Sequence, residues 1–167
     1  MAHEPELLIL DEPTSGLDTL VRRKFLESMV DVAATGRTVF LSSHQISEVE
    51  RVADHIAIMH QGRLMTCDSL ENLKALHERW VITYTTHDHS LPEFNGRVIS
   101  HEGIGTRRHQ MLVHQPDGEA LWKIRDHAGV VDVEVHVPSL EDIFVAYLKL
   151  DERPSVSRNQ VAPEAQS

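Results

Sequence analysis

The chain has 167 residues, of which 41% are apolar, enough for one ordinary domain or two small ones. Its formal net charge of −10 argues against nucleic acid or an anionic membrane surface as a direct partner. The single cysteine, Cys67, excludes an internal disulfide, and the longest apolar runs are far shorter than the ~20 residues that a membrane-spanning helix needs.

The first part of the chain alternates strands and helices. The continuous apolar run 7–10 is typical of a parallel strand covered on both faces. Asp18 is expected to cap a helix whose apolar residues recur at helical spacing up to Ala33, with Gly36 as its stop. The expected elements that follow are a strand, a short helix, two hairpin strands and a helix, at 38–42, 46–53, 56–59, 64–65 and 68–76. This alternation predicts an α/β layered sheet over residues 1–78.

The pattern changes near Glu78. Strand-like segments follow at 80–84, 97–100, 110–114 and 131–137, together with two helices that begin near Pro116 and Ser139. In the last strand valines alternate with polar residues, which predicts one buried and one wet face. We therefore expect a small α+β domain over residues 79–150 and, because its composition is polar and aperiodic, a disordered tail over 151–167.

Two carboxylates, Asp11 and Glu12, directly follow the first strand. In open α/β sheets, ligands bind beyond the carboxyl ends of the parallel strands. A carboxylate there can hold Mg²⁺, which favours one or two carboxylates together with water and phosphate oxygens. The next residue points in another direction and can polarise an attacking water molecule. The pair alone is equally compatible with a strand that merely ends in acidic residues before a proline turn.

Longer segments around this pair resemble a known family. LLILDEPTSGLD, residues 7–18, resembles the Walker B strand, catalytic glutamate and D-loop of ABC-transporter ATPase domains. TVFLSSH, residues 38–44, resembles the strand and switch histidine of that family, and EVERVADHIAIMHQGRL, residues 48–64, resembles its next helix and hairpin. The resemblance implies that residues 1–78 are the C-terminal part of a P-loop NTPase sheet of the ABC ATPase type.

The resemblance also assigns roles to individual residues. It implies that Asp11 serves Mg²⁺, that Glu12 is the general base, and that His44 contacts the γ-phosphate of ATP and the attacking water. The nucleotide-site residues of the D-loop, which faces a second ATPase subunit across the dimer, are Ser15, Gly16, Leu17 and Asp18.

Residues 79–150 resemble the small accessory domain that follows the ATPase domain in ABC exporter subunits of the drug and antibiotic type. VPSLEDIFVAYL, residues 137–148, carries most of this resemblance. The implied function is an ATP-hydrolysing exporter subunit that couples hydrolysis to transport through separate membrane permease subunits. The implied location is cytoplasmic, peripheral at the inner face of the cell membrane, with no nucleic acid partner and no direct membrane insertion.

The family motifs that precede the Walker B strand do not occur in this sequence. It contains no G-x-x-x-x-G-K-[S/T] segment, no LSGGQ-like signature and no glutamine loop. MAHEPE itself resembles the middle of the family's helix-to-strand link, so we expect Met1 to be an internal methionine of a longer domain. From these departures we expect an exposed half-sheet and little nucleotide binding by this chain alone.

Two other functions compete with an exporter subunit. A chromosome-maintenance or repair ATPase of the related head-domain type shares the Walker B strand and the D-loop, but it is expected to carry long heptad arrays, which this sequence lacks. A non-catalytic regulatory or pairing module could use its D-loop surface to bind an intact ATPase.

Overall fold

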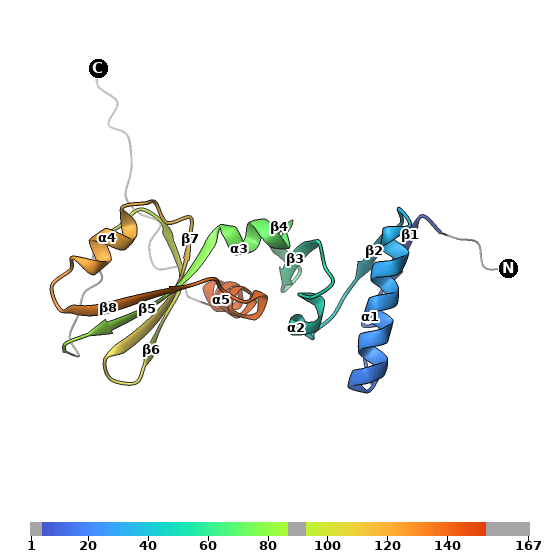
Figure 1. Cartoon of the computed structure of the whole chain (residues 1–167), viewed down its shortest axis with the longest axis horizontal. Coiled ribbons are helices and arrows are strands. Elements are labelled where there is room, and N and C mark those ends of the chain that lie inside the picture. Colours follow the sequence, from blue (N-terminus) through green and yellow to red (C-terminus); the bar gives the residue numbers. More distant parts are fainter. Residues whose placement is uncertain (1–4, 87–92, 153–167) are drawn as a thin grey trace, which may run out of the picture. The chain divides into compact units, whose positions relative to one another are not determined.

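The computed structural model describes residues 5–86 and 93–152. The chain divides into two compact units, one of residues 1–75 with 139–141, the other of residues 76–138 with 142–167 (Figure 1). Both units combine helices with strands, which confirms the predicted α/β class. In the described part of the chain no helix is long and apolar enough to cross a membrane.

The first unit begins with a strand–helix–strand arrangement. Strands β1 (Leu7–Leu10) and β2 (Thr38–Leu41) pair in parallel, with Leu7 opposite Thr38 and Leu10 opposite Leu41. Helix α1 (Thr19–Ala34) connects them, as parallel strands require a crossover. Alternate side chains of both strands are half-buried, whereas Leu7, Ile9 and Phe40 are 52%, 71% and 58% exposed. One face of this pair is therefore open in the chain, as expected for a half-sheet, and β1 is not covered on both faces.

Helix α1 starts at the predicted cap. Asp18 Oδ1 accepts hydrogen bonds from the backbone N–H groups of Leu20 and Val21, both at 3.0 Å. These bonds satisfy two of the donors that a helix N-terminus leaves unpaired. At the other end, the Gly36 amide bonds the Ala33 carbonyl at 2.9 Å, and Gly36 has a φ of +87°, which glycine adopts without a steric cost.

Removal of the cap should weaken α1. We expect Asp18→Ala to lower the free energy of unfolding of the first unit by about 0.5–2 kcal/mol, because two helix amides lose their acceptor. Urea unfolding followed by far-ultraviolet circular dichroism measures the loss. Asp18→Asn, which keeps the acceptor oxygen, is the control and should retain most of the stability. Equal losses in both variants would show that the charge, and not the cap, is what matters.

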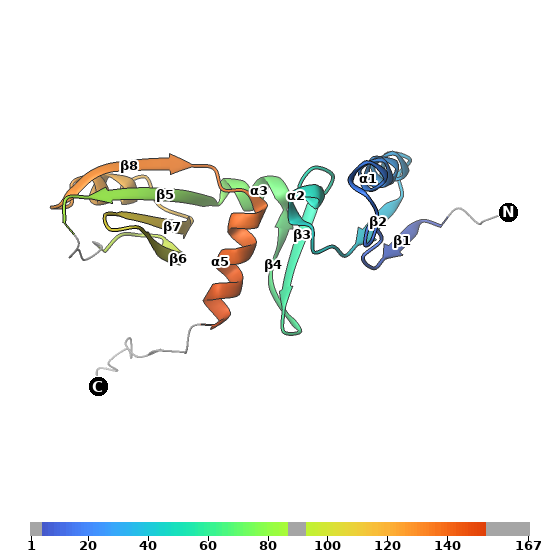
Figure 2. The same ribbon diagram turned by 90° about the horizontal axis from the view of Figure 1, so that it is seen from below.

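In the rest of the first unit, several helices and strands differ in length from the prediction. The helix expected over 46–53 is the single turn α2 (Ile46–Val49); beyond it the backbone mixes i→i+3 with i→i+4 bonds, so a regular helix does not continue. Strands β3 (His55–His60) and β4 (Arg63–Ser69) form an antiparallel hairpin (Figure 2). Strand β4 is longer than expected because pairing with β3 stabilises a segment whose side chains do not alternate. Helix α3 (Leu70–Ala75) follows, and Ser69 Oγ accepts the Asn72 amide at 3.1 Å.

The second unit is built on one antiparallel sheet. Its strands are β5 (His77–Tyr84), β6 (Arg97–Ile104), β7 (Arg108–His114) and β8 (Val130–His136), in the order β6–β7–β5–β8. Helix α4 (Ala120–Arg125) precedes β8, and α5 (Leu140–Glu152) follows it. The last two residues of α5 fall in the segment predicted as a tail, of which residues 153–167 lie outside the described residues.

The core of the second unit lies between the sheet and α4. Its buried side chains come from β5, β7, α4 and β8; they are Trp80, Ile82, Tyr84, Met111, Val113, Ala120, Ile124 and Val133. The predicted apolar face of β8 is only partly correct, since Val133 is buried while Val131, Val135 and Val137 are 62%, 40% and 73% exposed. The reason is that β8 is an edge strand, of which Val133 belongs to the core cluster that includes Ile124 of α4.

Candidate functional site

The parallel pairing of β1 and β2 brings two polar segments together at the carboxyl ends of these strands. Leu10 lies opposite Leu41, and the ladder extends by one more bond, from the Ser42 amide to the Leu10 carbonyl at 2.9 Å. Residues 11–12 and 42–44 therefore leave the sheet at the same edge, where ligands of open α/β sheets bind.

Ser42 connects the two acidic residues. Its Oγ donates to Asp11 Oδ1 at 2.5 Å and accepts the backbone N–H of Glu12 at 2.8 Å. A hydroxyl can do both at once because it carries one donor and two acceptor lone pairs. The side chain of Asp11 and the backbone of Glu12 are thus both held by one residue, 31 and 30 positions away in the sequence.

Glu12 turns toward His44. The backbone of Glu12 has a φ of +45°, in the left-handed region that residues with a β-carbon seldom adopt. Its Oε2 lies 2.8 Å from His44 Nδ1, and the two side chains are 36% and 65% exposed. Strained backbone at a polar, accessible position is a feature of binding and catalytic sites. A carboxylate next to an imidazole at this distance can hold and orient a water molecule between protein and ligand.

The predicted D-loop residues form two consecutive turns after Glu12. The Ser15 amide bonds the Glu12 carbonyl at 3.0 Å, and the Leu17 amide bonds the Thr14 carbonyl at 3.2 Å. Gly16 has a φ of +76°, so a side chain at this position would be strained. Thr14 is buried and anchors the turns, Ser15 and Gly16 are exposed, and Asp18 caps α1. The four predicted residues thus lie together on one exposed turn beside the Glu12–His44 pair.

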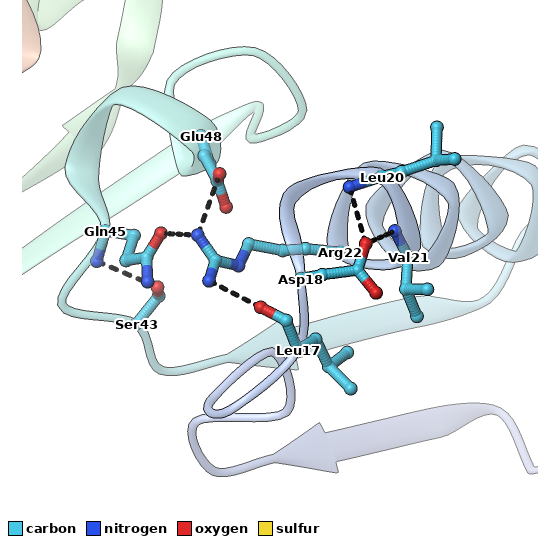
Figure 3. A network of polar contacts seen from close by, with 8 residues as sticks. All are labelled: Leu17, Asp18, Leu20, Val21, Arg22, Ser43, Gln45 and Glu48. Carbon is cyan, nitrogen blue, oxygen red and sulfur yellow. Dashed lines mark hydrogen bonds and ion pairs between the residues drawn. The ribbon is translucent and has the colours of Figure 1, made fainter.

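A half-buried arginine connects this turn to α2 (Figure 3). Arg22 Nη2 donates to the Leu17 carbonyl at 2.8 Å, and Arg22 Nη1 donates to Gln45 Oε1 and, at 3.1 Å, to Glu48 Oε1. The sequence-based prediction named neither Ser42 nor Arg22. The signal for Ser42 was its register, because a residue that follows Leu41 must lie beside the one that follows Leu10. Arg22 had a weaker signal: it is a charged residue on the first turn of a helix, close to the turn it contacts.

Comparison with known proteins shows what the chain is similar to. Residues 1–50 match the family model described as "AAA domain, putative AbiEii toxin, Type IV TA system". The bacitracin transport ATP-binding protein BcrA of Bacillus licheniformis is 31% identical over an alignment of length 165, which covers 87% of this chain and 49% of BcrA. An uncharacterised ABC transporter ATP-binding protein of Nostoc is 47% identical over 73 residues, 44% of this chain and 22% of that protein.

The chain is a homologue of ABC transporter ATP-binding proteins. A fluoroquinolones export ATP-binding protein of Mycobacterium tuberculosis is 42% identical over 79 residues, 47% of this chain and 26% of that protein. A solved structure of an ATP-binding subunit of an ABC transporter superposes with a TM-score of 0.40 and 38% identity over 43% of this chain and 30% of that one. The chain thus spans about half or less of the length of these relatives.

For an ABC ATP-binding homologue the donor set at Asp11 can be compared with what Mg²⁺ requires. Residues 5–86 and 93–152 contain no group of three or more His, Cys, Asp or Glu side chains that could hold a metal ion. A closed protein cage is therefore absent from the described residues. Magnesium bound with phosphate needs only one or two carboxylates and keeps several waters. Asp11 is exposed and has a carboxylate with one oxygen bonded to Ser42, so its second oxygen fits this mode.

Proposed function

We propose that this chain is the C-terminal portion of an ATP-hydrolysing exporter subunit, in which Glu12 is the general base. The observation that carries the proposal is the 2.8 Å contact between Glu12 Oε2 and His44 Nδ1 at the carboxyl edge of β1 and β2. The relatives named for bacitracin transport and fluoroquinolone export support export as the process that hydrolysis drives.

In this proposal each residue has a separate task. Asp11 holds Mg²⁺, which supplies charge neutralisation to the phosphates when it is bound. Glu12 accepts a proton from the attacking water, and His44 orients that water and the terminal phosphate from its fixed position beside the carboxylate. The exposed turn of Ser15, Gly16, Leu17 and Asp18 faces the nucleotide site and a second ATPase subunit. Its use as a contact surface fits its exposure and the rigid turns that shape it.

The proposal extends to the rest of the chain. We assign residues 1–78 to the ATPase domain and 79–150 to an accessory domain. The subunit works at the inner face of the cell membrane, where separate permease subunits hold it. A sheet with four antiparallel strands and two helices is a reasonable accessory module, because it has its own core.

Nucleotide affinity gives a direct test with the chain as it is. We expect Mg-ATP to bind more weakly than ~1 mM, which corresponds to only ~4 kcal/mol. The reason is that Asp11 and Glu12 meet the phosphates without the lysine and the amide cradle of a G-x-x-x-x-G-K-[S/T] segment, and like charges at ~4 Å repel by ~4 kcal/mol at an effective dielectric of ~20. Isothermal titration calorimetry measures the affinity, with the P-loop half added in trans as the positive control. Micromolar binding by the chain alone would contradict the proposed division of the site.

A further inference from the structure

An ion pair that is largely shielded from solvent, Arg22 with Glu48, joins two segments of the candidate site. The side chains of Arg22 and Glu48 are only 16% and 23% exposed. The Arg22 guanidinium contacts the carbonyl of Leu17, at the end of the exposed turn, with one nitrogen, and the side chains of Gln45 and Glu48 with the other. Figure 3 shows this fork between the start of α1 and the segment that leads into α2.

These contacts close a ring through the site. From Glu12 the chain passes through its two turns to Leu17, whose carbonyl accepts from Arg22. Arg22 also donates a hydrogen bond to Gln45, which directly follows His44 in the sequence. The His44 side chain in turn contacts Glu12. A displacement of the turn must therefore change the position of Arg22 or Gln45, or the contact between His44 and Glu12.

Stability alone does not account for this arginine. Arg22 Nε and Glu48 Oε2 are buried, and neither has a hydrogen-bond partner in the described part of the chain. A buried ion pair with an unpaired donor and acceptor contributes little or nothing to stability relative to apolar side chains of the same size. What the arginine does supply is fixed geometry, since its planar guanidinium holds its donors at fixed angles to acceptors in two separate segments.

We propose that Arg22 is a positioning residue that holds the turn 14–18 and the segment 43–48 in one arrangement, so that a partner surface pressing on the turn changes the position of His44. The consequence for hydrolysis rests on the proposed function, whereas the coupling between the two segments does not. Coupling of this kind is reciprocal, so a substitution on the α2 side must also change the stability of the turn.

The test is a double-mutant cycle on the full chain without nucleotide. Glu48→Gln keeps the shape of the side chain but removes the charge that holds Arg22 on the α2 side. We expect it to accelerate amide hydrogen exchange at Leu17 by about fivefold or more, the usual range of coupling between sites. In the Arg22→Met background the same Glu48→Gln change should have no further effect at Leu17. Should Glu48→Gln not fold, the neutral change Gln45→Ala takes its place in the cycle.

Two further measurements separate coupling from a general loss of stability. Exchange in the later turns of α1 should stay within about twofold of the parent, because only the turn is released. The Nδ1 resonance of His44 should move in Arg22→Met, as the ring loses its fixed approach to Glu12. Arg23→Met is the matched control: Arg23 is the next residue on α1, is exposed, and pairs only with Glu27 one turn on among the described residues. It should change neither observable.

The inference is wrong if Leu17 exchange is unchanged by Glu48→Gln, if it rises equally throughout α1, or if the effect persists in the Arg22→Met background. None of these outcomes depends on ATP. Failure of the proposed function would appear separately, as an assembled ATPase whose rate is insensitive to Glu12.

Discussion

Glu12→Gln should reduce ATP hydrolysis by about 10²–10⁴-fold in a protein in which the P-loop half is joined to this chain. The backbone of Glu12 is turned by its positive φ so that the carboxylate lies beside His44 at the carboxyl edge of the sheet. Glutamine keeps the length and shape of the side chain but has no basic oxygen to take a proton from water. Steady-state phosphate release measures the loss.

Nucleotide binding distinguishes the roles of the site residues in the same assembly. Glu12→Gln should bind Mg-ATP as tightly as the parent or more tightly, since it removes a negative charge next to the phosphates. Asp11→Asn should instead weaken binding in a manner that depends on the Mg²⁺ concentration. His44→Ala should slow turnover with a smaller effect on affinity, because its proposed task is orientation.

A variant with a near-parental rate would overturn the assignment of the base. If Glu12→Gln hydrolyses ATP normally while His44→Ala does not, the imidazole and not the carboxylate accepts the proton. If both variants are fully active, the 2.8 Å contact between the side chains of Glu12 and His44 has no catalytic role. Arg23→Met serves as a control for the assembly, since Arg23 is exposed and, among the described residues, pairs only with Glu27.

The positions of the candidate residues were largely predictable from the sequence. The apolar run 7–10 followed by two carboxylates predicts a strand that ends at a site, and the structure has β1 over these residues. Asp18 and Gly36 mark the ends of α1 because capping depends on a few neighbouring residues. Their assigned roles rest on the family resemblance and stay predictions.

What could not be predicted depends on contacts between distant segments. Ser42 and Arg22 meet partners 31 and 26 positions away, so their contacts follow from strand register and from the packing of α1, which residue types alone do not specify. The exposed valines of β8 have a similar cause. Alternation predicts an apolar face, but only the course of α4 decides which part of that face is covered.

Ile82→Ala should strongly destabilise the second unit, with a loss of about 2–5 kcal/mol. Ile82 is fully buried on the central strand β5, where it pairs with Val133 on one side and His109 on the other. The substitution leaves a cavity between the sheet and α4. The hydrogen bonds of β5 to β7 and β8 prevent the backbone from moving to fill it. Urea unfolding measures the loss, and the midpoint should fall by on the order of 1–2 M.

Tryptophan fluorescence restricts this measurement to the second unit. The chain has two tryptophans, Trp80 and Trp122, and both belong to that unit. Trp80 is fully buried while Trp122 is 70% exposed, so the change on unfolding comes mainly from Trp80, a core neighbour of Ile82. Ile104→Ala is the matched control: it removes the same atoms from a side chain that is 46% exposed at the end of β6, and it should cost less than about 1 kcal/mol. Equal losses for Ile82→Ala and Ile104→Ala would mean that the sheet is not packed against α4 in solution, and the assignment of this core would be wrong.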